Sequence, residues 1–60
     1  MSEYENRVLT AIKEGAVRPA QIVRKTCLSA EHVKQALRTL RKQKCVIESQ
    51  DGYQIVQNQT

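Results

Sequence analysis

Residues 19–44 contain a short helical pattern, a tight turn and a longer helical pattern, and this arrangement most constrains the fold. Pro19 suits the first position of a helix, because its missing N–H would have no intrahelical partner there. The apolar residues of the longer pattern share one helical stripe, at the i, i+3, i+4 and i+7 positions: Val33, Ala36, Leu37 and Leu40. The sequence therefore predicts helices over residues 19–26 and 30–43, joined by a turn at 27–29.

A further helix is predicted before this unit and a β-hairpin after it. The first helix covers residues 3–14, and its apolar stripe comprises Tyr4, Val8, Ala11 and Ile12, widened by Leu9. Gly15 is expected to end this helix in the left-handed conformation. After Lys44 the pattern changes from helical to extended, which predicts strands over residues 45–49 and 53–57.

The hairpin register depends on how residues 50–52 form the turn. A three-residue loop, Gln50-Asp51-Gly52, with Gly52 left-handed places four apolar residues on one face: Cys45, Ile47, Tyr53 and Ile55. A two-residue loop at Asp51-Gly52 would divide these residues between the two faces. We therefore favour the three-residue loop, because a register shift of one position turns every side chain over.

The length of 60 residues allows one domain, residues 1–60, with a small aliphatic core. A chain of this size buries only about 60% of its unfolded surface, which leaves little room for an enzyme pocket. The sequence contains no Ser/His/Asp set, no Gly-rich phosphate loop and no paired-carboxylate signature. We therefore expect no enzyme activity, no catalytic residue and no cofactor.

The two cysteines, Cys27 and Cys45, are far apart in the sequence, and His32 is the sole histidine. This spacing does not match a zinc site, so no metal is expected. Residues 1–6 are polar and acidic, unlike a secretory signal, and no apolar run approaches the roughly 20 residues of a membrane span. We therefore expect a cytoplasmic protein without a membrane partner, in which both thiols stay reduced.

Charge is distributed very unevenly along the chain. The formal charge is −1 over residues 1–15, +7 over 16–44 and −2 over 45–60. A strongly basic middle between acidic ends indicates a polyanionic partner at one face. The alternative interpretation is an ordinary solvated helix surface, which Lys and Arg often cover.

With these elements in order, nearly the whole chain resembles the winged helix-turn-helix superfamily of small DNA-binding transcriptional regulators. The resemblance is carried by Ile22, Val23, Leu28, Ser29, Val33, Leu37, Leu40, Val46, Gly52, Tyr53, Gln54 and Ile55. It implies an α+β fold, a three-helix bundle followed by a C-terminal β-hairpin wing. Three residues depart from the family pattern: Thr26 replaces an apolar residue, and Cys27 and Lys44 stand where glycines are common. A non-glycine residue in the left-handed conformation costs on the order of 1 kcal/mol.

The resemblance also implies sequence-specific binding of double-stranded DNA, with the third helix in the major groove. The exposed candidates for base contact are Ala30, Glu31, Lys34, Gln35 and Arg38. The candidates for phosphate contact are Arg24, Lys25, Ser29, Arg41 and Lys42. The hairpin has no Lys or Arg, so it is expected to add little affinity or to pair with another protomer.

One module of this size covers little DNA, so we expect a homodimer on DNA, and we see no small-molecule effector domain. Two alternatives remain open. The first is a protein-interaction winged helix, an accessory or adaptor that does not bind DNA and docks its partner through the hairpin. The second is redox sensing through Cys27 or Cys45, which would require a lowered thiol pKa and exposure.

Overall fold

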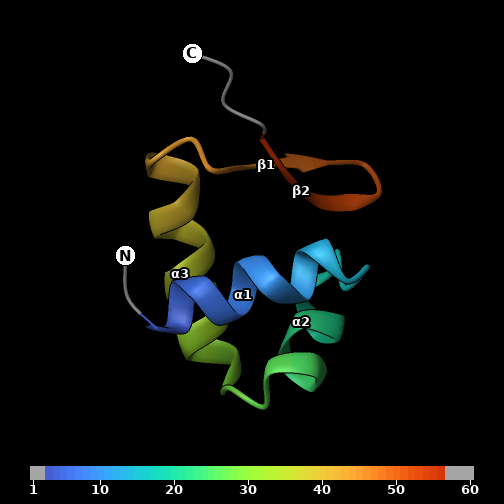
Figure 1. Ribbon diagram of the computed structural model, residues 1–60, viewed down its shortest axis with the longest axis vertical. Helices are drawn as coiled ribbons and strands as arrows, with labels where there is room; N and C mark the ends of the chain where they lie inside the picture. The colour runs from blue at the N-terminus through green and yellow to red at the C-terminus, as the bar shows by residue number, and fades with distance from the viewer. Residues whose placement is uncertain (1–2, 57–60) are drawn as a thin grey trace.

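The computed structural model describes residues 3–56, which form three helices followed by an antiparallel β-hairpin (Figure 1). The elements are α1 (Glu3–Lys13), α2 (Pro19–Thr26), α3 (Ala30–Lys42), β1 (Val46–Ser49) and β2 (Gly52–Ile55). The chain is therefore α+β, and the three predicted helices are confirmed to within one residue at each described end. The predicted end of the last strand, Gln57, lies outside the described residues.

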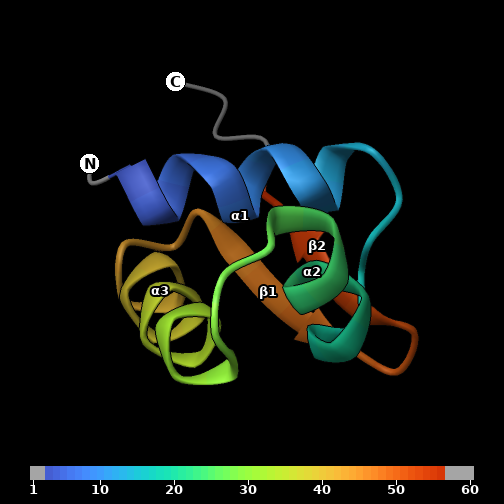
Figure 2. The same ribbon diagram turned by 90° about the horizontal axis from the view of Figure 1, so that it is seen from below.

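The core is aliphatic and lies where the three helices and the hairpin meet. Its buried members are Val8, Ala11, Ile12, Ala16, Ile22, Val33, Ala36, Leu37, Leu40 and Val46. Figure 2 shows α1 lying across α2 and α3, which leaves the outer side of α3 in solvent. The predicted stripe of α3 is thus confirmed in full, and it is this stripe that turns the polar side of the helix outward.

Tyr4, predicted on the buried stripe of α1, is instead 45% exposed. It belongs to the first turn of the helix, beyond the buried part of the stripe. Its ring stacks on the ring of His32 in α3, with centroids 4.6 Å apart and an interplanar angle of 16°. The contact ties the start of α1 to the first turn of α3 without burying the tyrosine.

Local hydrogen bonds define the turn between α2 and α3. The Thr26 hydroxyl donates to the Ile22 carbonyl oxygen at 2.7 Å and accepts the Leu28 N–H at 3.2 Å. Ser29 caps α3 as predicted, because its Oγ accepts the His32 N–H at 3.2 Å. The Thr26 hydroxyl therefore joins the last turn of α2 to the first residues of the turn.

Two residues other than glycine, Cys27 and Lys44, adopt the left-handed backbone conformation. Cys27 ends α2 with φ 61°, and Lys44 follows α3 with φ 60°. The Cys27 N–H donates to the Val23 carbonyl oxygen at 2.9 Å, as expected of a left-handed C-terminal residue. Gly15, with φ 103°, ends the α1 segment as predicted. Two side-chain-bearing residues are thus held where glycine carries no steric cost.

Replacing Lys44 with glycine is expected to stabilise the protein. Lys44→Gly removes the steric cost of a left-handed backbone, which is about 1–2 kcal/mol. It also gives the unfolded chain more conformational entropy, which lowers stability by about 0.5–1 kcal/mol. The free energy of unfolding should therefore rise by roughly 0.5–1 kcal/mol. Chemical denaturation followed by circular dichroism measures the change. The matched control is Lys34→Gly, the same substitution at an exposed position inside α3, which should cost about 1 kcal/mol. A loss of stability in Lys44→Gly would contradict the observed backbone conformation.

The predicted register of the hairpin is wrong by one position. The observed pairs are Val46↔Ile55, Ile47↔Gln54, Glu48↔Tyr53 and Ser49↔Gly52, so the loop consists of two residues, Gln50 and Asp51. Val46 is 2% exposed and faces the core, whereas Ile47 is 51% exposed on the opposite face. Because Val46 and Ile47 are both apolar, their order does not show which of them points inward.

A long-range contact fixes the observed register. The Tyr53 N–H donates to the Val17 carbonyl oxygen at 2.7 Å, so the segment after α1 borders the outer edge of β2. Gly52 has φ 126°, and a Cβ there would overlap the same Val17 oxygen. Only glycine therefore lets β2 approach this segment so closely, and the approach holds Tyr53 in place beside α2 and α3.

Candidate nucleic-acid interface

A groove of about 580 Å³ lies between α2, α3 and β2. Its floor is apolar and comes from all three elements: Val23, Val33, Leu37 and Tyr53. Pro19 and Ala20, at the start of α2, form the wall opposite α3, and Ala30 lies at the end nearest the turn. The groove therefore joins the helix-turn-helix unit to the hairpin along one face of the molecule.

Three exposed cations of α3 border this groove: Lys34, Arg38 and Arg41, here called the basic rim. They occupy positions i, i+4 and i+7, which form one row along a helix. At 1.5 Å of rise per residue the row is about 10 Å long. None of the described residues that line the groove is acidic. The rim thus presents positive charge in a line, at the edge of an apolar floor.

The other predicted α3 residues lie beside the groove rather than in it. Gln35 and Lys42 are exposed and do not line it. At 100° per residue they share the outermost side of α3, next to Arg38. Arg24 is exposed on the last turn of α2, also outside the groove. Gln35 and Lys42 therefore share the solvent-facing side of α3 with the basic rim, whereas Arg24 is exposed on the neighbouring helix.

The hydroxyl of Ser29 is used inside the protein. Its Oγ accepts the His32 N–H and lies 3.0 Å from His32 Nδ1, at the start of α3. A phosphate at this point would have to share the hydroxyl with the helix cap. The amide groups of the first turn remain the more suitable donors to an anion.

Lys25 is not brought to the basic rim. Its Nζ lies 3.2 Å from Glu14 Oε1, an ion pair between α2 and the end of α1. Both residues line a separate hollow between those two helices, together with Arg7 and Thr26. Lys25 is therefore paired with the residue that follows α1, on another part of the surface from the basic rim.

The sequence-based prediction missed two residues of this face, Glu48 and Tyr53. Arg41 Nη1 lies 3.7 Å from Glu48 Oε1, and both side chains are largely exposed. In the observed register Glu48 is opposite Tyr53 on the face that also carries the buried Val46. The predicted register placed Glu48 on the outer face, so no signal in the sequence connected it with Arg41.

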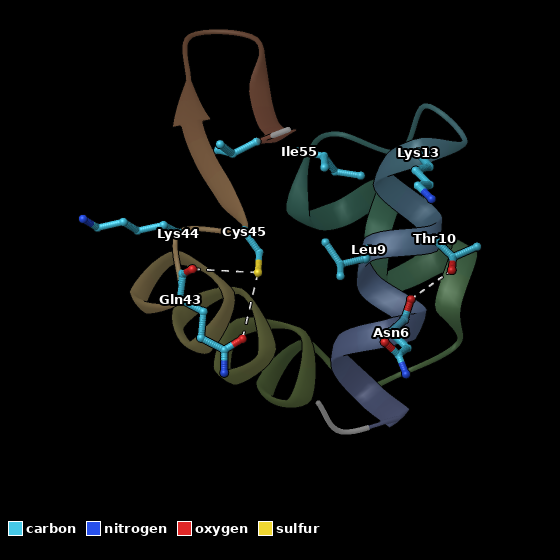
Figure 3. Close-up of a pocket in the computed structure, with 9 residues that line it drawn as sticks. Asn6, Leu9, Thr10, Lys13, Gln43, Lys44, Cys45 and Ile55 are labelled. Atoms are coloured by element: carbon cyan, nitrogen blue, oxygen red, sulfur yellow. Dashed lines mark hydrogen bonds between the residues drawn. The ribbon is translucent and has the colours of Figure 1, made fainter. Parts of the chain in front are cut away.

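A second hollow, of about 440 Å³, lies between α1 and the start of the hairpin (Figure 3). The apolar side chains of Leu9 and Ile55 point into it from opposite elements. The Cys45 thiol contacts two oxygens of Gln43: its Sγ lies 3.9 Å from the Gln43 carbonyl oxygen and 4.0 Å from Gln43 Oε1. The described residues that line this hollow include one thiol, Cys45, and no His, Asp or Glu.

The chain matches no protein-family model, no curated protein and no solved structure. In residues 3–56, no helix is long and apolar enough to cross a membrane. The same residues contain no group of three or more His, Cys, Asp or Glu side chains that could hold a metal ion. On the described surface, the basic rim and its groove combine a row of exposed cations with an apolar floor.

Proposed function

We propose that this chain is a winged helix-turn-helix domain that binds double-stranded DNA and acts as a small transcriptional regulator. The observation that carries the proposal is the basic rim, an exposed row of three cations on α3 beside the start of α2. A helix of about 10–12 Å diameter fits a major groove about 12 Å wide. The hairpin follows α3 in the position of a wing.

In this proposal the residues of α3 divide between bases and phosphates. Lys34 and Arg38 would bind guanine through O6 and N7, and Gln35 would bind adenine through N6 and N7. Ala30 allows close approach at the first turn. The remaining exposed cations on this side would contact phosphates: Arg24, Arg41 and Lys42. Lys25 could join them only by leaving Glu14.

The hairpin is an unusual wing, because it contributes acid rather than base. Glu48 and Asp51 are exposed, and residues 45–60 contain no Lys or Arg. DNA affinity should therefore come from α2 and α3. Because one such module buries little DNA, selective binding is proposed to require a homodimer on two half-sites.

The salt dependence of binding tests this proposal. Fluorescence anisotropy on a random-sequence duplex of about 25 base pairs should give log K falling with log salt at a slope near −3, for the three phosphate contacts named above. That slope corresponds to a loss of roughly 50-fold in affinity between 50 and 200 mM salt. The absence of binding at low salt, or binding insensitive to salt, would contradict the proposal.

One observation favours the alternative function, an adaptor that binds a protein partner instead of DNA. Ile47 is 51% exposed on the outer face of the hairpin, although it is one of the larger apolar side chains. A partner docked there would be lost in Ile47→Glu, whereas DNA binding through α3 would persist. Loss of DNA binding in this variant would mean that the hairpin, and not α3, provides the interface.

Neutralising Glu48 is expected to strengthen DNA binding. Glu48→Gln frees Arg41 from its ion pair and removes one negative charge beside the basic rim. At low salt the affinity should rise about three- to five-fold, and less at high salt, since exposed charges are screened. Glu3→Gln is the matched control, because it makes the same charge change in the exposed Arg7–Glu3 pair of α1. An equal increase in both variants would show a general charge effect only.

A further inference from the structure

The groove beside the basic rim has an apolar floor that takes no part in the DNA contacts proposed above. In the major groove the thymine methyl is the apolar group that bases present, while the rest of each edge is polar. The floor, however, includes Val23, Leu37 and Tyr53, and the groove above it has a volume of about 580 Å³. A face built for DNA alone would need the cations but not this floor.

We propose that this groove is also a docking site for an acidic protein segment, which places a large apolar side chain on the floor and carboxylates along the basic rim. Charge complementarity supports this occupant, since the three rim residues are cationic and no described lining residue is acidic. The protein already holds one carboxylate at this rim, with Glu48 Oε1 3.7 Å from Arg41 Nη1.

The shape of the groove favours a segment of protein over a small molecule. Small-molecule sites bury most of the ligand, whereas here Lys34, Arg38 and Arg41 are all exposed. The rim is about 10 Å long, so a helical segment with acidic residues at i, i+4 and i+7 would match it residue for residue. An apolar anchor between them would enter the groove, as in helix-in-groove recognition.

Occupation of the groove would cover the same cations that the DNA proposal uses. An acidic segment bound there and a DNA duplex would therefore exclude each other. Docking of the segment is independent of the proposed function, whereas the competition rests on it. The two can be measured separately, by direct binding of a peptide without DNA and by displacement of a duplex.

The test uses a fluorescein-labelled helical peptide of about 14 residues, with glutamates at the rim spacing and two leucines between them. A second peptide has the same charge but serines in place of the leucines. The full chain should bind the leucine peptide with a dissociation constant of about 10–100 μM, and the serine peptide at least about ten-fold more weakly. Equal affinity for the two peptides would overturn the proposal, because the floor would then play no part.

Two uncharged substitutions locate the bound peptide. Ala20→Leu places a larger side chain in the exposed wall of the groove, and should lower the affinity for the leucine peptide about ten-fold. Asn6→Leu adds similar apolar surface on α1, outside the groove, and should leave peptide affinity unchanged. Circular dichroism verifies that both variants keep their helices. Equal loss in both, or no loss in Ala20→Leu, would overturn the docking site.

The DNA arm separates this proposal from the previous one. Unlabelled leucine peptide should displace a labelled duplex from the protein at concentrations near its own dissociation constant. Peptide binding without any DNA binding would refute the proposed function and leave the docking site standing. DNA binding that the leucine peptide does not reduce would refute the shared face, and with it the proposed competition.

Discussion

Lys34→Glu combined with Arg38→Glu is expected to lower the affinity for duplex DNA by at least about 100-fold. Both residues belong to the basic rim and are exposed on successive turns of α3. Each loses a charge-assisted contact worth about 1–3 kcal/mol and leaves a carboxylate against DNA, while 1.4 kcal/mol is a factor of ten. Anisotropy titration at low salt measures the loss.

The matched control for this variant is Arg7→Glu combined with Lys13→Glu, two exposed positions of α1. Both double variants lower the formal net charge from +4 to zero, so any general electrostatic effect is the same. The control breaks the Arg7–Glu3 pair, but an exposed pair contributes little stability. Equal loss of DNA binding in the two variants would show that net charge, and not the α3 face, carries the affinity.

Leu40→Ala is expected to remove about 2–5 kcal/mol of folding free energy. Leu40 is 0% exposed, and it lies where α3 meets the hairpin: its carbonyl oxygen accepts the Cys45 N–H at 2.8 Å. A domain of this length has roughly 3–9 kcal/mol of total stability, so most of it would be lost. Urea denaturation followed by helical circular dichroism measures the change.

The control for the core variant is Gln43→Ala, an exposed position three residues further along. Surface substitutions of this kind usually change stability by less than about 0.5 kcal/mol. The difference in unfolding free energy between the two variants therefore measures the cost of removing the buried leucine atoms. If Leu40→Ala cost less than about 1 kcal/mol, the packing described for this core would be wrong.

The helices could be predicted because each is encoded by local residues. The apolar stripe of α3 fixes which side is buried, and hence that Lys34 and Arg38 point to solvent. Pro19 and Ser29 mark the starts of α2 and α3 through backbone chemistry that involves neighbouring residues only. These signals do not depend on how the rest of the chain folds.

The hairpin register could not be predicted, because the deciding contacts are remote in sequence. Val46 and Ile47 are equally apolar, and only the approach of β2 to Val17 shows which one is buried. Gly52 was expected within the turn, but it is the first residue of β2 and permits that approach. A pattern of two short strands contains no information about such a neighbour.

For the candidate site, the sequence predicts which side chains are exposed, but it does not predict which of them lie together. All the cations proposed from the sequence are exposed. That Lys25 pairs with Glu14, and that Tyr53 forms part of a groove with α2 and α3, depends on the packing of α1 and β2. Helical spacing assigns residues to a side of one helix, while a groove is made by several elements together.

The most direct test of the DNA-binding face is an NMR titration of the ¹⁵N-labelled protein with a duplex of about 12 base pairs at low salt. We predict that the largest amide shift changes fall in α3 from Ala30 to Arg41 and at Ala20 in α2, with little change across α1. Changes confined to α1 or to the hairpin around Ile47, or no change at saturating duplex, would contradict the account.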